Sequence, residues 1–295
     1  MPVASKLSRL IAAQTDGPSP RRAAPALRPA APYSKAFEKL EERRMLSTVD
    51  LPYRLDFDTA LAGTLTDGDG QGTGFTTVQQ NAAGNAHLPG NLDLDPSAGL
   101  LSITTTGSST TGSNVRSDDT LRNALATQFD ATSAFEVTAR IVGEGGGTLA
   151  QLNERYEQVG IMLGPDSDHF VKLVALYHDS GPRLQFTDEW LQPDGSYVSG
   201  GEGLLFAGSW DTVTTLDLRL AADPSTGQVT ASFRVNGGAW QQTPNTITVP
   251  TQHRAETFSE TGQAGVLAFH RNNTGPITVS FDWFEVERVV VGPED

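Results

Sequence analysis

The stretch QVGIMLGPDSDHFVKLVALYHDSGPRLQFT, residues 158–187, decides the fold class of this chain. It contains three apolar runs, at 158–163, 170–177 and 182–187, and each run has the length of a β-strand. Gly, Pro, Asp and Ser separate the runs, which gives both junctions the composition of a turn. The stretch therefore predicts three consecutive strands joined by short loops.

The same pattern extends from about residue 51 to about residue 290. No alternation of strands with helices is visible, and a short helix is expected only at 118–125. About ten strands without βαβ alternation predict one all-β domain, residues 51–290, folded as an antiparallel two-sheet β-sandwich of the jelly-roll type. The remaining strands are expected at 53–57, 100–105, 134–141, 214–220, 228–235, 265–269 and 278–289.

Composition and charge exclude several classes of protein. The chain has 21 Lys and Arg residues against 35 Asp and Glu residues, a net charge of −14, and it contains no cysteine. An acidic chain lacks the basic face that phosphate contacts need, so no nucleic-acid partner is expected. Without cysteine there are no disulfides and no thiolate chemistry. No apolar run approaches the ~20 residues that cross a bilayer, so no membrane span is expected.

Residues 1–50 differ from the rest of the chain. Residues 1–46 hold nine Lys or Arg and four Asp or Glu, whereas the remainder is strongly acidic. Proline and alanine dominate 16–33, which predicts a disordered basic segment. The string FEKLEERRMLS, residues 37–47, resembles the F-E-x-L-E-P-R-x-L-L-S sorting motif of exported planctomycete-type proteins, with Glu42 replacing proline and Met45 replacing leucine. The resemblance implies an extracellular or cell-surface protein; a plain basic tail is the alternative.

Four pieces of the β region occur in a characteristic order: YEQVGIML (156–163), FVKL (170–173), PRLQF (182–186) and FDWFEV (281–286). Together they resemble modules of the concanavalin A-like lectin/glucanase superfamily. The resemblance implies two curved antiparallel sheets and pairing of the first strand with the last. It also implies glycan binding on the concave face or in the rim loops.

Catalytic patterns are missing from the sequence. Glucanases of this superfamily carry E-x-D-x-(x)-E on one strand, because two carboxylates about 5–5.5 Å apart serve as nucleophile and acid. The nearest group, Glu285 and Glu287 with Asp282, has the wrong spacing. No G-x-S-x-G string is present, and the five histidines lack the spacing of a zinc motif. These absences predict that the chain is not an enzyme.

Sugar recognition needs aromatic faces and planar polar groups. Trp190 and Tyr197 lie in a segment expected to be a polar loop, so they are the candidates for stacking on a sugar ring. Lys172, Arg183 and Gln185 lie on expected strands and are the candidates for hydrogen bonds on the concave face. The alternatives are that Trp190 anchors the loop by packing and that the polar strand residues are simply solvated. Trp240 and Trp283 are expected in the core.

Calcium is the one cofactor that the sequence favours. Asp67 and Asp69 alternate with glycines in DGDGQGTG, residues 67–74, and calcium takes six to eight oxygen ligands. Val78 stands where an EF-hand needs glutamate, so that motif is excluded. A second candidate joins Asp56 or Asp58 on the first strand to Asp282 on the last. A solvated glycine-rich loop is the alternative.

Together these features predict a non-catalytic extracellular carbohydrate-binding module, whose partner is a polysaccharide or a cell-surface glycan. One alternative is a structural or adhesive surface domain without a small glycan ligand. Another is a glycoside hydrolase whose acid pair does not follow a known motif.

Overall fold

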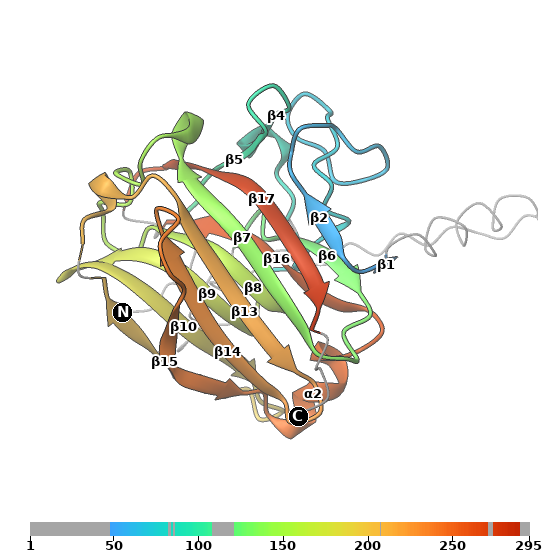
Figure 1. Ribbon diagram of the computed structural model, residues 1–295. Helices are drawn as coiled ribbons and strands as arrows, with labels where there is room; N and C mark the ends of the chain where they lie inside the picture. Colours follow the sequence, from blue (N-terminus) through green and yellow to red (C-terminus); the bar gives the residue numbers. More distant parts are fainter. Residues whose placement is uncertain are drawn as a thin grey trace, which may run out of the picture. The chain divides into compact units, whose positions relative to one another are not determined.

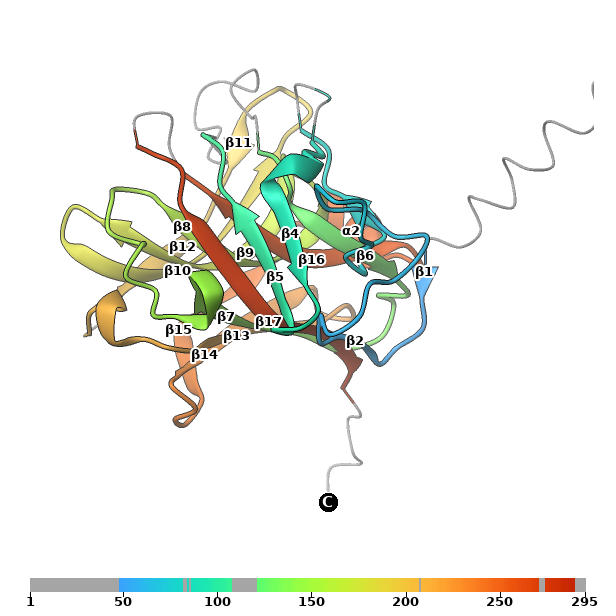
Figure 2. The ribbon, with the colours of Figure 1, turned by 90° about the horizontal axis from the view of Figure 1, so that it is seen from above.

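The computed structural model describes residues 48–81, 84, 86–107, 121–206, 208–270 and 274–289. In these residues the strands form two sheets that pack face to face, seen as two layers in Figure 2. The front layer of Figure 1 is the sheet that contains β7, β13, β14 and β17. The sorting-like string at 37–47 lies outside the described residues.

Sheet A has the spatial order β1-β6-β16-β8-β9-β10-β11, with β3 paired to β6 and β12 paired to β10. Its pairings are antiparallel except that of β1 with β6. The bounds are Thr48–Val49 (β1), Thr77–Val78 (β3), Leu125–Phe129 (β6), Gln158–Asp166 (β8), His169–His178 (β9), Gly181–Leu191 (β10), Tyr197–Val198 (β11), Gly201–Leu205 (β12) and Gly262–Phe269 (β16).

Sheet B has the order β15-β14-β13-β7-β17-β5-β4, with β2 paired to β17. Its pairings are all antiparallel. The bounds are Tyr53–Leu55 (β2), Leu92–Asp95 (β4), Leu100–Thr104 (β5), Phe135–Gly143 (β7), Leu216–Asp223 (β13), Gln228–Val235 (β14), Gln241–Thr248 (β15) and Thr278–Arg288 (β17). Short 3-10 turns at Pro89–Asn91, Glu144–Gly146 and Trp210–Thr212 and the helix α2, Thr251–Thr257, connect strands.

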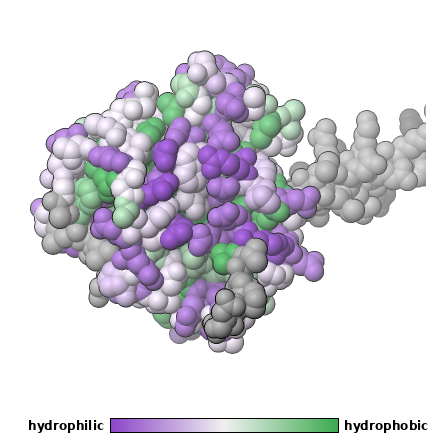
Figure 3. Space-filling view, in the orientation of Figure 1, coloured by the Kyte–Doolittle hydropathy of each residue, from purple (hydrophilic) through white to green (hydrophobic). Residues whose placement is uncertain are grey.

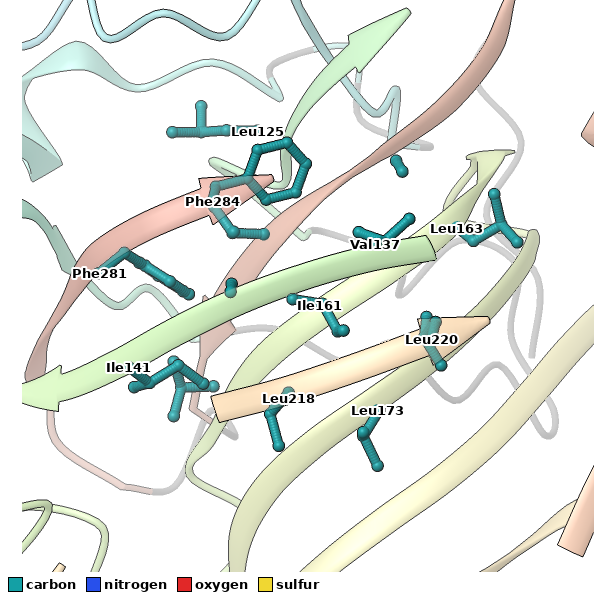
Figure 4. Packing of buried hydrophobic residues seen from close by; sticks show 14 of the residues in the cluster. Leu125, Val137, Ile141, Ile161, Leu163, Leu173, Leu218, Leu220, Phe281 and Phe284 are labelled. Atoms are coloured by element: carbon teal, nitrogen blue, oxygen red, sulfur yellow. The ribbon is translucent and has the colours of Figure 1, made fainter. Parts of the chain in front are cut away.

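The core lies between the two sheets (Figure 4). Alternate residues of each strand enter it, because successive side chains of a strand point to opposite faces of the sheet. Val137 and Ile141 of β7 lie in the same buried cluster as Ile161 of β8 and Leu173 of β9. Each of these four side chains is 0% exposed. Burial of this apolar face is what holds the layers together.

The predicted fold class, an antiparallel two-sheet β-sandwich, is confirmed. All ten expected strands are present, and β17 pairs with β2, so the expected pairing of the first and last predicted strands is present too. Residues 118–120 of the expected helix at 118–125 lie outside the described residues; for the rest the expectation is wrong, since strand β6 begins at Leu125 and residues 121–124 have no regular structure. The helix α2 was not expected; it follows Pro250, a residue whose fixed φ suits a helix start.

None of the helices in the described parts of the chain combines the length and the apolarity that crossing a bilayer requires.

Candidate active site

Charged side chains occupy the outer face of sheet B. Glu136 and Arg140 of β7 alternate with residues of the buried core cluster, and so do Asp217 and Arg219 of β13. These four side chains therefore point away from the core. Figure 3 shows hydrophilic side chains gathered across the middle of this face.

Asp217 is the centre of an ion-pair network on this face. Its side chain is 0% exposed, and its carboxylate accepts hydrogen bonds from Arg140, at 2.7 Å, and from Arg234. Arg140 also lies 3.4 Å from Asp282. A buried carboxylate needs such partners because an unpaired charge away from water is costly. The two ion pairs hold Arg140 and Arg234 on this outer face.

Two tryptophan rings lie against these arginines. The guanidinium carbons of Arg219 and Arg234 lie 4.5 Å and 4.8 Å from the ring centroid of Trp240. Arg54 and Arg140 lie 4.6 Å and 5.6 Å from the ring centroid of Trp283. Both rings are half-buried and neither belongs to the core clusters, so the expectation that they are core residues is wrong. Cation–π contact with arginine offers a tryptophan a stable position outside the core.

Two adjoining hollows open on this face. One, of about 270 Å³, is lined by Trp240, Arg219 and Gln242 among others. The other, of about 500 Å³, extends toward Asp223 and Val289. The two hollows share Glu136, Ala221 and Thr230 as lining residues, so they form one continuous groove, which we call the sheet B groove. Small side chains at 221 and 230 leave this space open.

A carboxylate pair lies beside the sheet B groove. Glu136 of β7 and Glu287 of β17 are direct partners across the two antiparallel strands, and both side chains point outward. Side chains in that position have Cβ atoms about 4.5–5.5 Å apart, and like charges there destabilise the sheet. Arg219 partly offsets this cost, since its Nη1 lies 3.3 Å from Oε2 of Glu136. A pair of carboxylates beside a groove is the group that a glycosidase needs as nucleophile and acid.

The predicted sugar-stacking residues lie elsewhere. Trp190 belongs to strand β10 rather than to a loop, is 0% exposed, and donates its indole N–H to Asp188 at 2.7 Å. A stacking role for Trp190 is therefore wrong and the alternative, packing, is what the structure shows, because the strand continues past residue 187 and turns this ring toward the core. Tyr197 is half-buried in β11, and its hydroxyl donates to Asp168 at 2.9 Å.

The predicted polar strand residues lie on the outer face of sheet A. Lys172 is 0% exposed; its ammonium donates to Gln158 at 3.2 Å and lies 5.5 Å and 5.2 Å from the rings of Phe170 and Phe269. Arg183 and Gln185 are half-buried on the neighbouring strand β10. The structure brings these residues to one face, but away from Trp190, which points into the core. Their role in ligand binding stays a prediction.

The predicted calcium residues belong to two separate candidate sites, Asp67 with Asp69 and Asp56 or Asp58 with Asp282. Asp67 is 2% exposed, and its carboxylate accepts backbone N–H bonds from Asp69, Gln71 and Leu94, at 2.8 to 3.0 Å, so it organises its own loop. Calcium binding stays a prediction. The remaining candidates have separate partners: Asp56 pairs with Arg54, Asp58 accepts from Thr59, and Asp282 pairs with Arg140.

Among the described residues, the side chains that are grouped closely enough to hold a metal ion are His169, His253 and Glu256. Sequence spacing did not reveal this group, because His169 opens β9 whereas the other two lie on α2.

Sequence reasoning also missed Glu136, Arg219 and Trp240. A signal was present in the string DLRL, residues 217–220, where charged residues alternate with leucine. That alternation predicts a charged outer face. It could not give the partner of each charge, because those partners come from other strands.

Comparison with solved structures finds the fold in glycoside hydrolases. The GH43 protein BlXynB from Bacillus licheniformis is similar with a TM-score of 0.54 and 14% identity, and a mutant of it with 0.55 and 14%. In both cases the match covers 82% of this chain and 40% of the other. A GH16 protein from Bacteroides ovatus is similar with a TM-score of 0.48 and 9% identity, covering 79% of this chain and 99% of that one. No family model and no curated protein matches the sequence.

These findings correct two predictions. The structures reported above with a TM-score over 0.5 are those of a GH43 protein, which contradicts both the interpretation as a non-catalytic carbohydrate-binding module and the prediction that the chain is not an enzyme. The reasoning failed because the missing E-x-D-x-(x)-E string excludes only one arrangement, a catalytic carboxylate pair carried by a single strand. Carboxylates on two neighbouring strands leave no such string. At this identity the likeness itself concerns the fold, and this chain spans about 40% of the length of the GH43 protein.

Proposed function

We propose that the chain processes glycans, and that it hydrolyses glycosidic bonds of a polysaccharide in the sheet B groove. The observation that carries the proposal is the Glu136–Glu287 pair, which stands on adjacent strands beside a groove lined by Trp240 and Arg219. The glycoside hydrolases that share the fold support the reaction class.

The two carboxylates have different surroundings, which separates their roles. Arg219 holds Glu136 at 3.3 Å and fixes the direction of its carboxylate, which suits the nucleophile. Glu287 is exposed and is assigned the remaining role, that of acid and base. The stereochemistry of the product tests the distance between the two carboxyl groups, because about 5–5.5 Å goes with retention and about 6.5–9.5 Å with inversion at the anomeric carbon.

Substrate binding is assigned to the groove lining. The Trp240 ring is held by two arginines and offers an apolar surface to the C–H side of a sugar. Ser232, Thr230 and Gln242 line the same hollow and supply hydroxyl and amide groups for hydrogen bonds. Export to the cell surface or beyond, where polysaccharides are met, stays a prediction from the string at 37–47.

The test is hydrolysis of a panel of polysaccharides by the full chain, measured as released reducing ends. Glu136→Gln and Glu287→Gln should each lower the rate about 10²–10⁴-fold, the usual contribution of a positioned acid or base. Glu285→Gln is the matched control, because Glu285 lies two residues away on the same strand and is paired with Arg54 instead. A wild-type chain without activity on any substrate would refute the proposal, as would full activity in both variants.

A further inference from the structure

A second cluster of polar side chains lies away from the sheet B groove, where α2 meets the start of β9. One ligating atom from each of His169, His253 and Glu256 can be chosen so that all three lie within 4.8 Å of one another. The two imidazole rings have centroids 4.8 Å apart, and the His253 ring is stacked on Trp190 at 5.3 Å. Residues distant in sequence thus present two imidazoles and a carboxylate at one point.

Each histidine already has a carboxylate at Nδ1. Asp166 lies 2.9 Å from Nδ1 of His169, and Glu256 lies 2.7 Å from Nδ1 of His253. A carboxylate that accepts from one ring nitrogen fixes the tautomer and leaves a lone pair on the other nitrogen. Metal-ligating histidines usually have this support. Asp166 of β8 has this supporting relation to His169 of β9, whereas Glu256 of α2 is itself a candidate ligand beside His253.

The second nitrogens of the two rings differ in their partners. His253 is 7% exposed, and its Nε2 has no hydrogen-bond partner within the described part of the chain. Nε2 of His169 lies 3.3 Å from the carbonyl oxygen of Leu191. A carbonyl oxygen accepts, so this contact needs Nε2–H of His169 as the donor, and a metal at that nitrogen would replace it. A cation between Nδ1 of His253 and the Glu256 carboxylate would take both as ligands in place of the proton that they share, with His169 as the third ligand.

We infer that His169, His253 and Glu256 bind a divalent transition-metal ion of the zinc class. Two imidazoles and one carboxylate form a ligand set that zinc accepts, with the fourth position open to water. Ligands about 2.0–2.2 Å from zinc lie about 3.3 Å from each other, so side-chain rotations close the present spacing. The ion fastens α2 to the first residue of β9. This inference is independent of the proposed hydrolysis.

The experiment is titration of zinc chloride into the full chain, made without a polyhistidine tag and freed of metal with a chelator. Calorimetry should give one equivalent of zinc, and zinc should raise the melting temperature while the same concentration of calcium does not. Cobalt in place of zinc should give visible absorption bands of a low-symmetry site. Absence of zinc binding by the wild-type chain would overturn the inference.

Variants assign the binding to these side chains. Glu256→Gln should weaken zinc binding about tenfold or more, the usual effect of losing a ligand or its supporting carboxylate. Its side chain is 45% exposed, so this variant tests binding without threatening the fold. His169→Ala should abolish the calorimetric signal. The matched control is His87→Ala, since Nε2 of His87 contacts Thr66 in another loop. Wild-type affinity in both Glu256→Gln and His169→Ala would refute the assignment.

Discussion

Replacement of Asp217 by alanine should be among the more destabilising single changes on the polar face of sheet B. The Asp217 side chain is 0% exposed and accepts from both Arg140 and Arg234. Removing one partner of a buried ion pair costs about 3–5 kcal/mol, because the remaining charge is left without compensation. The two arginine side chains are 28% and 29% exposed and retain some contact with water, which places the expected cost near the lower end.

A loss of about 3 kcal/mol corresponds to a fall in melting temperature of roughly 6–12 °C for a domain of this size. Asp217→Asn should show much of the loss, since it keeps the shape but leaves both arginines unneutralised. The assay is thermal and urea unfolding of both variants. The matched control is Asp56→Ala, whose ion pair with Arg54 is exposed at 53% and 40% and should contribute below about 1 kcal/mol. If Asp217→Ala unfolds at the same temperature as Asp56→Ala, the ion-pair reasoning is wrong.

Two further predictions concern other parts of the sandwich. Trp190→Ala should lower the free energy of unfolding by about 3–5 kcal/mol in a urea titration, because this fully buried ring fills the core. An unchanged transition would contradict the packing role of Trp190. The pKa of Asp130 is lowered to about 2, first by the hydroxyl of Thr132, then by its backbone N–H and by Arg288. Since the folded pKa lies below the usual 3.8, the associated stability is present above that value and is lost as the pH falls toward 2. A carboxyl titration by NMR should show this midpoint, and Thr132→Val should raise it; equal midpoints would contradict the assignment.

The local pattern of apolar runs and turn residues was enough to predict the β-sandwich architecture. The apolar runs at 158–163, 170–177 and 182–187, separated by turn residues, specify strands because alternation and turn chemistry act over a few neighbouring residues. The same information predicted β2 and β17, which the fold then pairs. It erred at residues 188–191, where β10 continues and buries Trp190, since the pairing of Trp190 with His169 of β9 extends the strand beyond its apolar run.

The candidate sites, in contrast, exist only in the folded chain. Glu136 and Glu287 become neighbours through the register of β7 and β17, and no sequence motif encodes a register between strands so far apart in the chain. His169 meets His253 because α2 packs beside the start of β9, again across a long separation. The sequence by itself determined that the chain is an acidic, cysteine-free β-sandwich, because composition and periodicity are local properties. Only the tertiary structure decided which carboxylates and imidazoles face each other, because that depends on sheet order and pairing register.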